Sequence, residues 1–186
     1  MPVQKVTREE ILQKALQVFK RQGYHRTTMD DLARACGLLK GSFYHYFRSK
    51  EVLMQEVLWY AAEFNQQHVF SLAYDETKPP RQRLERVLDT LFEGVQRTEG
   101  GCLMGNTVLE TALTNQEFKE PLRAHFNYAM TALAHLYQMR HPAEQAQQLA
   151  QQATAEIQGS LLLVKLFGDE QLLTDCRNRI LERLSP

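Results

Sequence analysis

The 186-residue sequence predicts an all-α fold. Apolar residues recur every three or four positions through most of the chain, which is the spacing of amphipathic helices. Glycine and proline interrupt this pattern at intervals, as they do between helices. The sequence shows neither the alternating pattern of a half-buried strand nor an internal repeat. We therefore expect a three-helix domain in residues 1–50, followed by a larger helical domain in residues 51–186.

The first expected helix covers residues 7–22. Thr7 and Glu10 have the spacing of a capping box, in which each side chain satisfies a backbone amide of the other residue. An apolar stripe follows, and Gly23 comes where the helix should end. This helix would support the two that come next.

Residues 27–53 predict two short helices around a tight turn, with a further helix starting at once. Thr28 and Asp31 form a second capping-box pair, and Gly37 stands where a left-handed helix end needs glycine. The next segment, Lys40 to Tyr46, places small, polar and aromatic side chains around one buried Phe. A helix of this composition suits a DNA groove, where it can contact phosphates and base edges.

The run from Gly37 to Glu51, G-x-x-K-G-S-F-Y-H-Y-F-x-S-K-E, resembles the N-terminal domain of TetR-type transcriptional regulators. The resemblance covers roughly residues 7–60. One departure is Leu39, because the family usually has a capping Ser or Thr just before this Lys. The amides at the start of the fourth helix also favour a phosphate beside Lys50. The resemblance implies a DNA-contact set of Thr28, Lys40, Gly41, Ser42, Tyr44, His45 and Lys50.

The distribution of charge agrees with this interpretation. Residues 1–50 hold ten basic and four acidic side chains, a net charge of +6. Residues 51–186 carry −6, so the chain as a whole is neutral. A basic N-terminal part is the electrostatic feature expected of a nucleic-acid-binding module.

The rest of the chain predicts further helices separated by a linker at residues 74–80 and by glycine or proline. Their expected ranges are 50–72, 81–97, 103–113, 116–139, 143–167 and 169–184. The apolar stripes of the last two helices can either close the core of one chain or form a four-helix bundle between two copies. Mainly on the resemblance, we favour a homodimer, with interface residues Ile157, Leu161, Val164, Leu173 and Ile180.

The resemblance implies an effector chamber in the middle helices, residues 81–139. Four polar side chains there can face a cavity, although a place on the surface or in the core is an equal alternative: Asn106, Glu110, His125 and Tyr128.

Cys102 follows two glycines and opens a helix, where backbone amides favour a reactive thiolate, and Arg97 can add to this effect. The Gly-Cys-Leu junction resembles that of a subset of TetR-type regulators that sense electrophiles or oxidants. The alternative is a small residue packed at a turn. We expect Cys36 and Cys176 to be packing residues.

Several classes of function lack a supporting pattern. We find no catalytic set of nucleophile, base and acid, no phosphate loop, and no metal-ligand spacing, so we expect no enzyme, metal or cofactor. No apolar run is long enough for a membrane span, and no signal-peptide core is present, which favours a cytoplasmic location.

The sequence thus predicts a homodimeric repressor that an effector releases from a palindromic, double-stranded DNA operator. The effector is either a small molecule or an electrophile that reacts with Cys102. A DNA-binding architectural protein without an effector is the third alternative.

Overall fold

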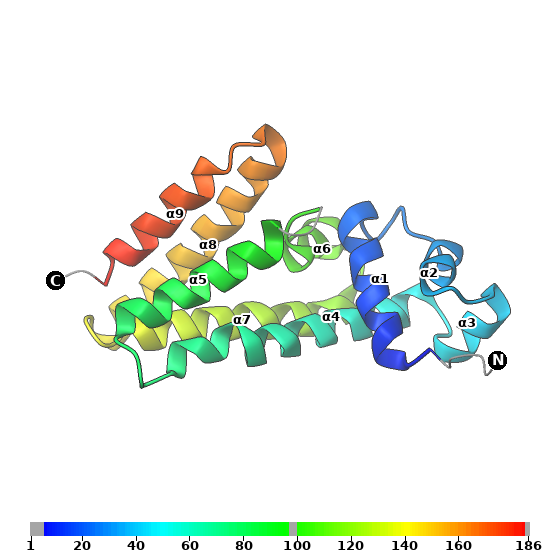
Figure 1. Cartoon of the computed structure of the whole chain (residues 1–186), viewed down its shortest axis with the longest axis horizontal. Coiled ribbons are helices and arrows are strands. Elements are labelled where there is room, and N and C mark those ends of the chain that lie inside the picture. Colours follow the sequence, from blue (N-terminus) through cyan, green and yellow to red (C-terminus); the bar gives the residue numbers. More distant parts are fainter. Residues whose placement is uncertain (1–5, 97–99, 185–186) are drawn as a thin grey trace. The chain divides into compact units, whose positions relative to one another are not determined.

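The computed structural model describes residues 6–96 and 100–184, and all regular secondary structure in these residues is helical. Figure 1 shows the order of the elements. The α-helices are α1 (Arg8–Gln22), α2 (Met29–Cys36), α3 (Lys40–Tyr46), α4 (Lys50–His68), α5 (Pro80–Gln96), α6 (Leu103–Thr111), α7 (Lys119–Tyr137), α8 (Ala143–Phe167) and α9 (Gln171–Glu182). Two short 3₁₀ helices, η1 (Phe70–Tyr74) and η2 (Gln116–Phe118), precede α5 and α7.

The helices group into two compact units. The first contains α1, α2, α3, most of α4 and, from later in the sequence, Leu103–Leu122 with α6. The second contains Glu63–Cys102 and the chain from Arg123 onwards. This grouping differs from the functional boundary that we expected after residue 50, which stays a prediction. None of the described helices is long and apolar enough to cross a membrane.

The N-terminal helices begin and end where the sequence predicts. Both expected capping boxes are present, with Thr7 and Glu10 at α1 and Thr28 and Asp31 at α2. Gly37 ends α2 in the left-handed region, with φ 70°. In the first unit, apolar side chains from four helices are fully buried, among them Ile11, Phe19, Leu32, Phe43 and Leu53.

Two of the expected helices are divided. The predicted helix 50–72 ends at His68 and continues as η1, where the Ser71 hydroxyl donates to the Gln67 carbonyl (2.6 Å). The predicted helix 116–139 begins as η2 and becomes α-helical at Lys119.

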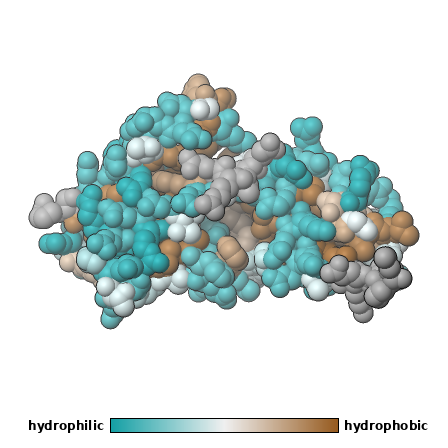
Figure 2. Space-filling model, viewed as in Figure 1, coloured by the Kyte–Doolittle hydropathy of each residue, from teal (hydrophilic) through white to brown (hydrophobic). Residues whose placement is uncertain are grey.

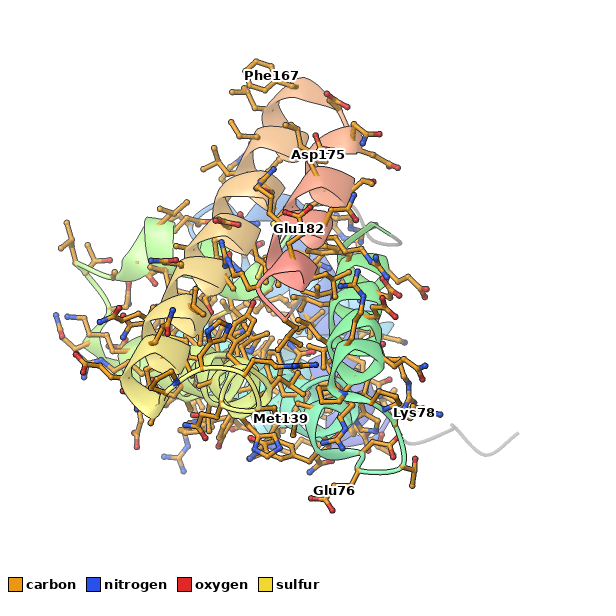
Figure 3. All side chains as sticks on the ribbon, turned by 90° about the vertical axis from the view of Figure 1, so that its left-hand side faces the viewer. Glu76, Lys78, Met139, Phe167, Asp175 and Glu182 are labelled. Carbon is orange, nitrogen blue, oxygen red and sulfur yellow. The ribbon has the colours of Figure 1, made fainter. Side chains whose placement is uncertain are left out.

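The core of the second unit is formed by η1, α5, α7, α8 and α9. Helices α8 and α9 lie side by side as an antiparallel pair (Figures 1 and 3). Small residues of α8, such as Ala146, Ala150 and Ala153, are fully buried, which allows close helix packing. The Tyr137 ring is also fully buried, and its hydroxyl donates to the Ile180 carbonyl (3.2 Å).

Candidate nucleic-acid interface and effector region

The turn between α2 and α3 is fixed from both sides. At the start of α2, the Thr28 hydroxyl donates to the Asp31 carboxylate (2.6 Å), and this bond lowers the pKa of Asp31. At the far side of the turn, Phe43 and Phe47 have exposed fractions of 0% and 1%. These rings anchor α3 by its inner face, so its outer face is presented to solvent.

The outer face of α3 carries most of the predicted DNA contacts. Its members are exposed and come from one short helix: Lys40, Gly41, Ser42, Tyr44 and His45. Tyr44 has an exposed fraction of 41%. A Cβ added at Gly41 would meet nothing within 4 Å, so the backbone is open to close approach there. Tyr46 is half-buried instead, and its hydroxyl donates to the Val6 carbonyl (3.1 Å).

Lys50 has a structural environment that the sequence did not reveal. Its ammonium donates to the carbonyls of Tyr24 (2.9 Å), Thr27 (3.0 Å) and His25 (3.5 Å). It also lies 4.4 Å from the centre of the Tyr24 ring. The ammonium therefore closes the turn between α1 and α2, whereas a phosphate contact by Lys50 stays a prediction. Lys40, by contrast, forms an ion pair at the surface, with its Nζ 2.9 Å from Oδ1 of Asp30.

Leu39 is the N-cap of α3 and makes no side-chain capping bond. The family's usual cap is therefore missing, as expected. The Leu39 side chain has an exposed fraction of 81%, although it is large and apolar.

Glu110 lies in α6 and holds the turn after α1. Its carboxylate accepts from the amides of Tyr24 (2.8 Å) and His25 (3.2 Å). A Cβ at Gly23 would lie 2.6 Å from this carboxylate, and Gly23 has φ +77°, so glycine fits the position for two reasons. This contact could not be predicted from the sequence, because the partners are 86 positions apart. Asn106, on the same helix, is half-buried.

The other two predicted effector residues lie in α7, in the second unit. His125 has an exposed fraction of 4%, and its Nδ1 has no hydrogen-bond partner among the described residues. Burial lowers the pKa of His125 to about 4, so the imidazole is neutral near pH 7. Its ring contacts Phe70 and Phe126. Tyr128 is half-buried against the core.

The second unit also has a groove of about 490 Å³ between Tyr74, α7 and α8. Tyr74 stacks on His135 there, with ring centres 4.5 Å apart. Gln138, which directly follows α7, and Gln147 and Gln151 of α8 also line the groove. None of the four predicted effector residues lines this groove. Its residues come from three separated segments, so the sequence pattern could not assemble it.

Most of the predicted dimer-interface residues are buried in the core of their own chain. Ile157, Leu161, Leu173 and Ile180 have exposed fractions of 6% or less and pack in the core of their own chain. Val164 is half-buried against the same core. These stripes meet each other within one protomer, since α8 and α9 form a pair. They therefore contribute to the chain's own core, and their part in a dimer interface stays a prediction.

Cys102 directly precedes α6 and is half-buried, whereas Cys36 and Cys176 are buried. Burial raises the pKa of both buried thiols. The Gln158 amide lies 3.9 Å from the Cys102 sulfur. Both glycines before it have positive φ, 102° and 78°. Arg97, which we expected to activate this thiol, lies outside the described residues.

A capped helix, a tight turn and a second helix with an exposed polar and aromatic face define a helix-turn-helix protein. Residues 11–57 match the family model of bacterial regulatory proteins of the TetR family. Residues 80–179, more than half of the chain, match the C-terminal domain of LmrA/YxaF-like transcriptional regulators. The chain therefore belongs to the TetR family and is a transcriptional regulator.

Relatives and solved structures agree with this assignment. An uncharacterized helix-turn-helix regulator from the lacX 3' region of Lactococcus lactis is 29% identical over 90% of this chain and 87% of its own. The transcriptional repressor DhaR of a Mycobacterium species is 33% identical over 55% of this chain and 51% of its own. A TetR regulator from Legionella pneumophila has the same fold, with a TM-score of 0.87 at 21% identity over 96% of this chain and 97% of that one.

Proposed function

We propose that the chain is a repressor that binds a palindromic operator as a homodimer and leaves it when an effector binds. The observation that carries the DNA interface is the exposed polar and aromatic face of α3, anchored from behind by Phe43 and Phe47. The naming of a relative, DhaR, as a transcriptional repressor supports repression rather than activation.

The proposed dimer uses a surface other than the predicted stripes. Four large apolar side chains remain exposed at the end of α8, with exposed fractions of 38–69%, and we call them the α8-end patch: Leu162, Leu163, Leu166 and Phe167. Phe167 points away from its own unit at the tip of α8 (Figure 3). A cluster of this kind is costly in water and is typical of an interaction site. Because the family is typically dimeric, a second copy is the occupant we propose.

Effector binding is proposed for the second unit. The groove beside Tyr74 and the buried Nδ1 of His125 both offer polar groups for a ligand. They favour a sensor over an architectural protein without an effector. Helix α4 contributes residues to both units, so a ligand-dependent shift of α4 can alter the spacing of two recognition helices. That spacing must match successive major grooves, roughly 34–36 Å apart.

Operator selection from random DNA tests the proposal. We expect a two-fold symmetric sequence to be enriched by the full-length protein, and Tyr44→Ala to weaken binding to it by at least tenfold. Tyr74→Ala is the matched control, because this tyrosine is similarly exposed (47%) but belongs to the other unit. Failure to enrich any sequence, or equal binding by both variants, would reject the DNA interface proposed for α3.

A covalent effector is the second candidate, favoured by the exposure of Cys102 relative to the two buried thiols. Its thiolate would add to a C=C bond of a quinone: a carbon–sulfur bond forms, the π bond breaks, and the resulting enolate takes a proton from water. We expect peptide mass spectrometry to find Cys102 modified first by the quinone, and Cys102→Ser to keep operator binding while losing release by the quinone. If Cys102 is the least modified thiol, a reversible ligand becomes the remaining candidate.

A further inference from the structure

Leu39 is unfavourable for the local stability of α3 on two counts. It occupies the N-cap of α3, a position where Leu is among the poorest residues because it offers no acceptor for the first amides. It also has an exposed fraction of 81%, so almost none of its apolar surface is removed from water. A residue that satisfies neither capping nor burial in the folded chain is a candidate for a contact outside it.

The position of Leu39 indicates what that contact is. It directly precedes Lys40, Gly41 and Ser42, the exposed start of the recognition helix. Hydrophobic surface appears at the α2–α3 turn in Figure 2, next to the predominantly polar surface of this unit. In helix-turn-helix proteins, the N-terminal residues of the recognition helix contact base edges in the major groove.

The major-groove edge of DNA carries only one apolar group, the C5-methyl of thymine. Cytosine and uracil lack this methyl group, and the purines present hydrogen-bonding atoms instead. Leu39 offers no hydrogen bond, so its side chain can distinguish bases only through that methyl. Gly41, two residues later, adds no side chain that would hold the backbone away from the bases.

We propose that Leu39 is a specificity residue that contacts a thymine methyl group in each operator half-site. This inference rests on the proposed function, since it requires that α3 enter the major groove. The Ser or Thr usual at this position would cap α3, whereas we assign Leu39 an apolar contact with a base. An apolar contact adds sequence preference, whereas the lost cap lowers the stability of α3.

The experiment removes one methyl group at a time. Each thymine of the selected operator is replaced singly by uracil, which leaves base pairing unchanged, and affinity is measured for the wild type and for Leu39→Ala. For the wild type, we expect one symmetric position at which uracil weakens binding roughly fourfold per half-site, as the burial of one methyl group predicts. For Leu39→Ala, thymine and uracil should bind equally there. Because Leu39 is exposed, we expect this variant to fold normally.

Leu39→Ser is the matched control, because it restores a capping side chain without an apolar surface. We expect it to unfold at a higher temperature than the wild type and to be insensitive to uracil at the same position. The inference is overturned if no position loses affinity with uracil, or if the loss is unchanged in both variants. Under either outcome, the proposed function stays intact if Tyr44→Ala still weakens operator binding by at least tenfold. If Tyr44→Ala has no effect, the proposed function itself fails.

Discussion

The helix-turn-helix, residues 28–47, and the α8–α9 pair, residues 143–182, both carry a clear helical pattern, but the two patterns have opposite outcomes. In the helix-turn-helix, the Phe43 ring is buried and the polar face remains in solvent, as the sequence predicts. In the α8–α9 pair, the apolar stripes assigned to a second copy are buried within one chain. Periodicity identifies the buried face of a helix, but it does not identify what covers that face.

The largest expected effect distinguishes a helix face covered by its own chain from one covered by a second copy. Ile180→Asp should unfold the protein, at a cost of about 4 kcal/mol, because it places an unpaired charge in the core of the chain. Leu166→Asp, at a position with an exposed fraction of 69%, should keep the fold and dissociate the dimer. Thermal unfolding and light scattering measure the two effects.

The opposite results would contradict this assignment. If Ile180→Asp is folded but monomeric, the apolar stripe of α9 belongs to the dimer interface. A Leu166→Asp variant that remains fully dimeric at micromolar concentration would exclude the α8-end patch from the proposed interface.

The second prediction concerns His125. The unfolded chain binds a proton at this side chain below about pH 6.5, whereas the folded chain does so only near pH 4, because burial disfavours the charged form. Stability should therefore fall as the pH falls through this window, by about 3 kcal/mol from this residue. Urea unfolding at about pH 7 and pH 4 measures this loss. His125→Leu should reduce it. Equal pH dependence in the wild type and in His125→Leu would contradict the assigned burial.

The third and smallest prediction concerns two lysines of the predicted DNA-contact set. Lys50→Met should destabilise the first unit by about 2 kcal/mol, because three carbonyls lose a charged donor. Lys40→Met should change stability by less than about 1 kcal/mol, since its ion pair with Asp30 is exposed. If Lys50 contacts phosphate instead, its variant should keep the wild-type unfolding temperature and lower the salt slope of binding by about one per half-site.

The sequence by itself determined the elements of this protein and the character of α3. Capping boxes at Thr7 and Thr28, and the left-handed glycine at position 37, act over three or four residues, so they can be identified without a fold. Five residues of α3 are exposed because the same short helix turns Phe43 into the core: Lys40, Gly41, Ser42, Tyr44 and His45. The family resemblance gave these residues their expected role.

Only the tertiary structure decided which surfaces the later helices pack against and which charged side chains bind backbone groups of the same chain. Ile157 and Ile180 are core residues because α8 packs against α9. The apolar pattern of either helix alone does not predict this pairing. Glu110 and Lys50 bind backbone groups of the turn after α1, and those groups are distant in sequence and carry no residue-specific pattern. Long-range contacts to the main chain leave no trace in side-chain spacing, and for that physical reason the sequence could not predict them.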